Sequence, residues 1–205
     1  MALDRARPKA KFGDDMESFN QAAFLWLNAP AHPSAGMLYL TVFLAQGLIW
    51  AVPAGMVLGW LCGNEKMRRT LLIATASGAL GLCISMVIGL AWPHPRPFML
   101  GLGHRLIPHA ADASFPSDHL TLWWAVAFSL WFKRRRLGTA LALLGIPIAW
   151  ARIYLGVHFP LDMLGAAVVA GFSAWFTLRQ SHWYLEPLYR VALGIHRSLF
   201  GRPLP

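Results

Sequence analysis

The sequence predicts an all-α integral membrane protein, a helical bundle of five spans with one further helix at its N-terminus. Two observations predict this class. The 205-residue chain is 57% hydrophobic and only 13% charged, whereas a soluble domain carries about 25% charged residues. Five stretches contain no Asp, Glu, Lys or Arg, namely 37–62, 70–92, 120–132, 137–151 and 163–178. The first two are long enough to cross a hydrocarbon core of ~30 Å, and the other three need flanking residues to do so.

The N-terminal segment is expected to lie outside the bundle. Residues 1–17 are predicted to be a polar, mobile tail. Residues 18–30 are amphipathic, with apolar side chains near one helical face at Phe19, Ala23, Trp26 and Leu27. Polar amide side chains make this segment a poor span, which favours a helix lying in the membrane interface. A short sixth span is the alternative, and it would place the basic tail in the cytoplasm.

The bundle is predicted over residues 37–178 of a single domain, 1–205, and alternation of the spans predicts its topology. The spans cross in this order: 37–62 inward, 70–92 outward, 117–132 inward, 137–154 outward and 160–178 inward. This order places two basic clusters, 66–69 and 133–136, in cytoplasmic connections, as the positive-inside rule requires. Residues 179–205 are then expected to form a cytoplasmic tail.

The charge distribution also bears on the partners. A net charge of +9 could indicate nucleic acid. The cations are concentrated in short connections and after the last span, so we expect a membrane and a lipid as partners, and no nucleic acid. Cys62 and Cys83 lie in apolar stretches and are interpreted as small core residues. The pattern predicts no particular oligomeric state.

Residues that can carry chemistry gather on the opposite, external side. They lie in three short strings: His94 to Phe98 (HPRPF), Phe115 to His119 (FPSDH) and Ala151 to Asp162 (ARIYLGVHFPLD). Counting the spans brings five charged or titratable side chains of these strings to one membrane face. These are Arg96, His119, Arg152, His158 and Asp162.

This combination of residue types is typical of phosphoryl transfer. Guanidinium groups bind phosphate oxygens bidentately and keep their charge, and a helix that begins after Ser117 would offer its free N–H groups to an anion. One histidine can attack phosphorus while the other protonates the leaving oxygen. Asp162 can orient the His158 imidazole. Because Pro160 suits the first helical position, we expect His158 just outside a helix whose first turn holds Asp162.

The three strings resemble the signature of the type 2 phosphatidic acid phosphatase superfamily, Lys-x6-Arg-Pro, Pro-Ser-Gly-His and Ser-Arg-x5-His-x3-Asp. Arg96-Pro97 matches the end of the first. The string 116–119 matches the second with Asp118 in place of Gly, and Arg152-x5-His158-x3-Asp162 matches the third with Ala151 in place of Ser. The resemblance covers residues 92–162.

The resemblance implies a role for each matching residue. His158 would be the nucleophile, Asp162 its partner and His119 the general acid. The phosphate would be held by Arg96, Arg152 and Ser117. The family's catalysis uses no metal or other cofactor, and none is expected here. Histidines outside the strings are expected to be structural: His32, His104, His109, His182 and His196.

One departure from the signature concerns phosphate binding. Gly89 stands where the family has its lysine, and we consider His94 and Arg105 as substitutes for that charge. Asp118 either complements the helix dipole or positions an arginine.

Asp118 and the amino-acid sequences of all three strings are similar to those of the bacterial undecaprenyl-diphosphatase branch, the bacitracin-resistance type. That similarity implies a C55 isoprenoid diphosphate substrate and a site facing the periplasm, at the outer face of the inner membrane. Other lipid substrates remain open, among them phosphatidylglycerophosphate, phosphatidic acid and lipid A. A lipid phosphotransferase and a non-catalytic lipid-binding or transport protein are further alternatives.

Overall fold

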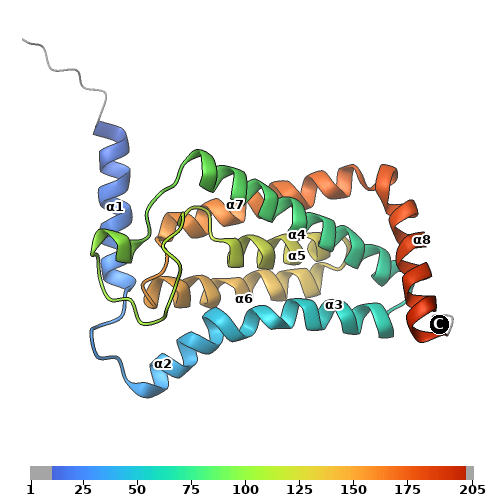
Figure 1. Ribbon diagram of the computed structural model, residues 1–205, viewed down its shortest axis with the longest axis horizontal. Coiled ribbons are helices and arrows are strands. Elements are labelled where there is room, and N and C mark those ends of the chain that lie inside the picture. The colour runs from blue at the N-terminus through green and yellow to red at the C-terminus, as the bar shows by residue number, and fades with distance from the viewer. Residues whose placement is uncertain (1–10, 202–205) are drawn as a thin grey trace, which may run out of the picture.

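The computed structural model describes residues 11–201, and these residues form helices joined by loops, with no strand among them (Figure 1). The α-helices are α1 Lys11–Leu27, α2 Ala35–Val42, α3 Ala51–Cys62, α4 Glu65–Ala91, α5 Asp118–Lys133, α6 Arg135–Tyr154, α7 Pro160–Arg179 and α8 Ser181–Phe200. Shorter helical turns are η1 Phe43–Gly47, η2 Leu48–Trp50 and η3 Pro97–Leu100. The prediction of an all-α protein is confirmed.

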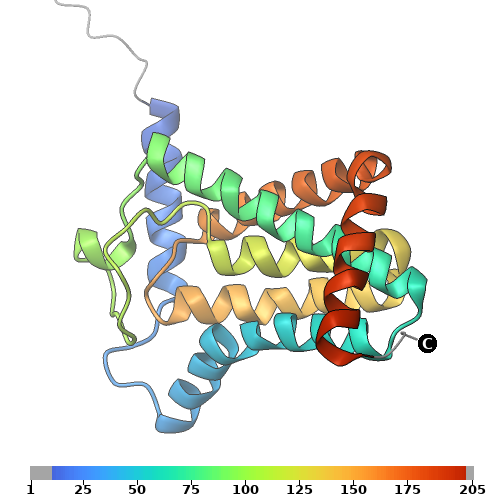
Figure 2. The same ribbon diagram turned by 45° about the vertical axis from the view of Figure 1, so that its right-hand side comes forward.

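The bundle is built around α5, which packs against α4, α6 and α7 (Figures 1 and 2). Its Leu120, Trp123 and Ala125 are buried in the main core cluster. Within residues 11–201, four helical segments are long and apolar enough to cross a membrane: Ala35–Cys62, Glu65–Ala91, Arg135–Tyr154 and Pro160–Arg179. The chain is therefore a multi-pass membrane protein. The remaining predicted span, 117–132, corresponds to the 16-residue α5. A total of five spans stays a prediction.

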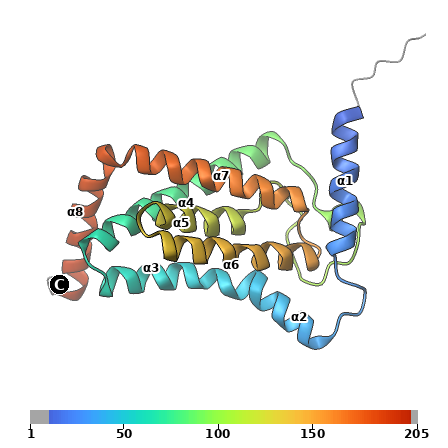
Figure 3. The same cartoon turned by 180° about the vertical axis from the view of Figure 1, so that it is seen from behind.

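The first predicted span is interrupted in its middle. A π-helical turn, Phe43–Gly47, and a 3-10 turn, Leu48–Trp50, separate α2 from α3, and the two helices meet at a bend (Figure 3). Pro53 explains the position of this irregularity, because it has no N–H group to bond the carbonyl of Ile49.

Two indole groups join α5 to α6 in the core. The Nε1–H of Trp123 donates to the carbonyl of Leu141 at 2.7 Å, and that of Trp124 donates to Ala142 at 3.1 Å. Gly145 permits the second contact, because a Cβ atom there would lie 2.2 Å from Nε1 of Trp124. These bonds satisfy buried donors and set the register between the two helices.

Helix α1 crosses the end of the bundle instead of running along it (Figures 1 and 3). This arrangement favours the interfacial alternative, and Trp26 is 85% exposed on it. Residues 11–17, predicted to belong to a mobile tail, form the first turns of this helix. Acidic residues at a helix start are favourable, and Glu17 accepts a hydrogen bond from Gln21 one turn later. The remainder of the predicted tail, residues 1–10, lies outside the described residues.

Helix α8 crosses the opposite end of the bundle (Figure 2). Residues 179–205 were expected to be a tail, and residues 181–200 of that segment are instead helical. Apolar residues recur at helical spacing and are exposed on one face, at Leu188, Val191, Ile195 and Leu199. Such a helix suits the membrane interface. The predicted tail rested on the arginines of this segment, which do not indicate secondary structure.

Candidate active site

The three motif strings meet at the end of the bundle that α1 crosses (Figure 3). The loop between α4 and α5 supplies Arg96, the start of α5 supplies His119, and the end of α6 supplies Arg152. His158 lies in the short connection from α6 to α7, and Asp162 lies in the first turn of α7. The convergence expected from counting spans is therefore present in the structure.

His158 is held by its Nδ1 atom. This nitrogen lies 3.1 Å from Oδ2 of Asp162 and 3.1 Å from the carbonyl oxygen of Ser114. Both neighbours are acceptors, so the proton of a neutral imidazole belongs on Nδ1 and the lone pair on Nε2. The ring is 2% exposed, and its reactive nitrogen has a defined direction.

Two guanidinium groups face that lone pair. Nη1 of Arg96 and Nη2 of Arg152 each lie 3.1 Å from Nε2 of His158. The two side chains are 5% and 1% exposed. An anion bound beside Nε2 would meet both cations at once, in surroundings where charge-assisted hydrogen bonds are strong.

Arg96 is fixed by the loops around it. Its Nε donates to Asp112 at 2.8 Å, Nη1 donates to the carbonyl of Val157 at 2.9 Å, and Nη2 donates to the carbonyl of Ala113 at 3.1 Å. Arg152 is held less completely, because its buried Nε has no hydrogen-bond partner within residues 11–201. That donor is free for a phosphate oxygen.

Asp162 joins the start of α7 to the loop before α5. Its Oδ2 accepts from the hydroxyl of Ser114 and from the N–H of Phe159, the latter at 2.8 Å. Pro160 occupies the first position of the helix, as predicted. Asp162 therefore caps α7 and orients His158 with the same oxygen atom.

The start of α5 places two further predicted residues. Ser117 occupies the N-cap position, but its side chain forms no cap hydrogen bond, contrary to the expected capping role. The hydroxyl is buried without a partner in the described part of the chain, so it is free to bind an anion. His119 is half-buried in the first turn, and it lies close enough to His158 for its charge to lower the pKa of that residue.

The two residues considered as substitutes for the missing lysine have contacts of their own, and the ring of His94 lies 5.7 Å from that of Phe159, beside the site. His94 contacts Glu17, with 3.4 Å between Nε2 and Oε2, and Arg105 lies over the ring of Phe98 at 4.7 Å. Asp118 forms no ion pair among the described residues. At Gly89 a Cβ atom would lie 3.2 Å from that of Ala113, so the loop that binds Arg96 occupies the space beside this position.

Sequence reasoning missed three residues of the site, all in the loop between α4 and α5. The hydroxyl of Ser114 donates to Asp162, and Asp112 accepts from Arg96. His109, expected to be structural, lies with Nε2 3.0 Å from Nη2 of Arg152, and its ring centre is 6.0 Å from that of His158. Burial, followed by the charge of Arg96, lowers the pKa of His109, so it faces the anion site as a neutral ring.

Helix α1 braces the connection that carries His158. The side-chain amide of Asn28 donates to the carbonyl of Tyr154 at 3.0 Å, and its oxygen accepts from the N–H of His104 at 2.6 Å. The oxygen of Asn20 accepts from the N–H of Leu161 at 3.1 Å. The polar residues that made this segment a poor span therefore position the site.

Gly156 allows the tight turn before His158. Its φ angle is +78°, and a Cβ atom there would lie 2.2 Å from the carbonyl oxygen of His104.

Gly156→Ala is expected to lower the free energy of unfolding by about 2 kcal/mol or more, since the left-handed conformation alone costs about 1–2 kcal/mol. Thermal unfolding measures this, with Gly36→Ala as the control because a Cβ atom at Gly36 meets nothing within 4 Å. Equal stability of the two variants would contradict this account of the turn.

The chain is similar to known proteins in sequence and in fold. The sequence model of the PAP2 superfamily matches residues 70–186, which is more than half of the chain and includes all three strings. The chain belongs to the PAP2 superfamily. YbjG of Escherichia coli (strain K12) is 37% identical, over 88% of this chain and 95% of YbjG.

Two further proteins are similar to this chain, one in sequence and one in fold. Undecaprenyl-diphosphatase BcrC of Bacillus subtilis (strain 168) is 34% identical, over 89% of this chain and 94% of BcrC. The crystal structure of Aquifex aeolicus LpxE aligns with a TM-score of 0.65 and 23% identity, over 78% of this chain and 95% of LpxE. The second likeness supports the fold alone.

Proposed function

We propose that the chain is an undecaprenyl-diphosphatase that removes the terminal phosphate of its lipid through a phosphohistidine on His158. The observation that carries the chemistry is the setting of this imidazole: Nδ1 faces Asp162, and Nε2 faces the guanidinium groups of Arg96 and Arg152. The choice of lipid is supported by the similarity to BcrC over nearly the full length of both chains.

In the proposed first step, the lone pair on Nε2 of His158 attacks the terminal phosphorus. An N–P bond forms and the bond from phosphorus to the bridging oxygen breaks. His119 gives its proton to the departing oxygen, while the two arginines and the hydroxyl of Ser117 bind the charge that develops on the phosphoryl oxygens.

The second step hydrolyses the intermediate. His119, now neutral, removes a proton from water, which attacks phosphorus and breaks the N–P bond. The products are undecaprenyl phosphate and inorganic phosphate, and His119 is again protonated. Asp162 stabilises the positive charge that His158 carries during transfer.

The pH dependence of kcat/KM follows from the setting of His158. Burial lowers the pKa of this histidine well below 6.5, and Arg152 and Arg96 lower it further. The neutral ring is the nucleophile, so on the acid side activity is lost as the pH falls through this lowered pKa, and the acid limb lies below pH 6.5. Arg96→Gln removes one cation and is expected to move the limb to higher pH. An acid limb above pH 6.5 in the unmodified enzyme would exclude this setting for the nucleophile.

We further propose that the site faces the periplasm, at the outer face of the inner membrane. The basic clusters at 66–69 and 133–136 lie at the other end of the bundle from His158, and such clusters mark the cytoplasmic side. A cysteine introduced at exposed Ala110 is then expected to react with an impermeant thiol reagent in intact cells.

Phosphate release from a panel of purified lipids tests the substrate. We expect undecaprenyl diphosphate to be turned over with a kcat/KM at least tenfold above that of phosphatidylglycerophosphate, phosphatidic acid or a lipid A phosphate. A preference for a glycerolipid monophosphate would refute the isoprenoid assignment and leave the phosphohistidine chemistry standing. Transfer of the phosphate to a second lipid, without release, would identify a phosphotransferase.

A further inference from the structure

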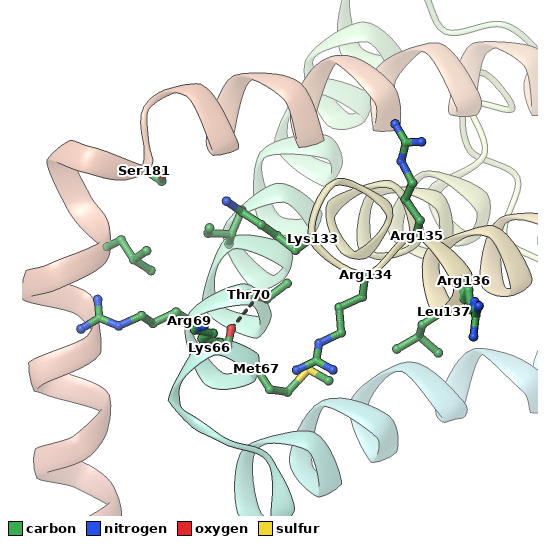
Figure 4. Close-up of a pocket in the computed structure, with 12 residues that line it drawn as sticks. Lys66, Met67, Arg69, Thr70, Lys133, Arg134, Arg135, Arg136, Leu137 and Ser181 are labelled. Carbon is green, nitrogen blue, oxygen red and sulfur yellow. Dashed lines mark hydrogen bonds between the residues drawn. The ribbon is translucent and has the colours of Figure 1, made fainter.

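A hollow lined by basic and apolar side chains lies at the end of the bundle opposite His158. It has a volume of about 820 Å³ and lies between the start of α4, the connection from α5 to α6 and the start of α8 (Figure 4). Six basic residues line it: Lys66, Arg69, Lys133, Arg134, Arg135 and Arg136. We call it the basic pocket. None of its residues takes part in the chemistry proposed above.

Most of the positive charge in the basic pocket is not neutralised. Arg69 pairs with Glu65 at 2.7 Å and with Glu186 at 2.8 Å, and Arg135 lies over the ring of Trp131. The other four basic side chains form no ion pair with any residue in the described range 11–201. Like charges that line one pocket repel one another, so an anion bound among them would be stabilised.

The surrounding helices add to this preference for an anion. Helices α4, α6 and α8 all begin at the basic pocket, and α6 and α8 have no side-chain cap on their first N–H groups. Free N–H groups and the helix dipole favour negative charge at such ends. In Figure 4, Lys133 and Arg134 extend from the α5–α6 connection toward the start of α4.

The walls of the basic pocket indicate what kind of anion would fit. Met67, Ile73, Leu137 and Leu185 line it beside the cations, so a ligand there meets both charge and hydrocarbon. Helix α8, which forms one wall, exposes a row of apolar side chains that suits the membrane interface. The Arg69–Glu186 pair ties this helix to α4. A free phosphate would use the cations and leave the apolar walls uncovered.

We propose that the basic pocket binds the phosphate headgroup of an anionic phospholipid from the leaflet opposite the active site. The headgroup lies among Lys66, Lys133 and Arg134, and the acyl chains leave along the apolar walls. If the basic residues served only to orient the spans in the membrane, cations in a loop would be sufficient, and a hollow with apolar walls would not be needed. The expected contribution is about fivefold in affinity for each cation that contacts the phosphate.

Lipid-dependent thermal stability of the full-length protein in neutral detergent tests the proposal. Dioctanoyl phosphatidylglycerol is titrated, and the unfolding midpoint is followed by the fluorescence of the ten tryptophans. A ligand that binds the folded state raises the midpoint in a saturable way. We expect such a rise with phosphatidylglycerol and none with an equal concentration of dioctanoyl phosphatidylcholine. Inorganic phosphate is a product of the active site, and any rise that it causes is expected to be unchanged in Lys133→Ala/Arg134→Ala.

Two double variants with the same change in charge locate the site. Lys133→Ala/Arg134→Ala is expected to weaken the apparent affinity for phosphatidylglycerol about 25-fold. Arg179→Ala/Arg197→Ala removes two exposed cations from the same end of the molecule, outside the basic pocket, and is expected to change it less than twofold.

Three outcomes would overturn the proposal. They are an equal rise with phosphatidylcholine, an equal loss of affinity in both double variants, and a saturable rise with inorganic phosphate that Lys133→Ala/Arg134→Ala abolishes. The last would assign the basic pocket to free phosphate. If the Lys133 and Arg134 variant does not fold, the single variant Lys66→Ala takes its place, with an expected fivefold loss.

Discussion

His158→Ala is expected to lower the rate of lipid phosphate release by about 10⁴- to 10⁶-fold, the range found when a covalent nucleophile is removed. Nε2 of His158 is the nitrogen that faces both arginines, so its loss removes the atom proposed to form the N–P bond. The rate is measured as phosphate released from undecaprenyl diphosphate by the purified variant.

Two controls show whether the loss is chemical. His158 is buried, so His158→Gln, which fills more of its space, checks for collapse of the site and is expected to be equally inactive. His182→Ala, a histidine on α8 at the other end of the bundle, is expected to keep normal turnover. Activity within tenfold of normal in folded His158→Ala would contradict the proposed nucleophile.

Arg152→Lys and Arg96→Lys are each expected to reduce kcat by about 10²- to 10³-fold, comparable to the loss of one preorganised donor to a transition-state oxyanion. Lysine keeps the charge but not the planar fork that donates to two oxygens at once. Arg96→Lys also leaves the carbonyls of Val157 and Ala113 without their donor, so its thermal unfolding midpoint is expected to fall as well.

Arg105→Lys is the matched control for both arginines. It belongs to the same loop between α4 and α5 as Arg96, but its contact is the ring of Phe98. We expect kcat within twofold of normal. A loss at Arg105 equal to that at Arg152 would show that an Arg→Lys change in this loop lowers kcat without any contact with the phosphate, and it would contradict the role given to the guanidinium fork.

The helical bundle could be predicted because its signals are local. Uncharged stretches of sufficient length identify spans, and the basic connections orient them. Once alternation was applied, His158, Asp162 and Arg152 had to lie at one end of the bundle. Their mutual distances are set by the short connection between α6 and α7, and the position of Pro160 predicted that connection correctly.

The remainder of the site could not be predicted because the loop that builds it has no periodicity. Ser114, Asp112 and His109 approach His158 through the path of a long irregular segment, and their spacing along the chain does not reveal that path. The same applies to Asn28, whose bonds reach the end of α6 across more than a hundred residues. Helix α8 was not predicted for another reason. Its arginines indicate the cytoplasmic side of the membrane but do not indicate secondary structure, which only the spacing of its apolar residues does.

Covalent trapping tests the central claim most directly. The enzyme is mixed with undecaprenyl diphosphate labelled with ³²P in the terminal phosphate, and the reaction is stopped within milliseconds in alkaline denaturant, where phosphohistidine survives. We predict label on the peptide that contains His158, and no label in His158→Ala. Label on a different residue, or turnover in His158→Ala with label still on the protein, would contradict the account.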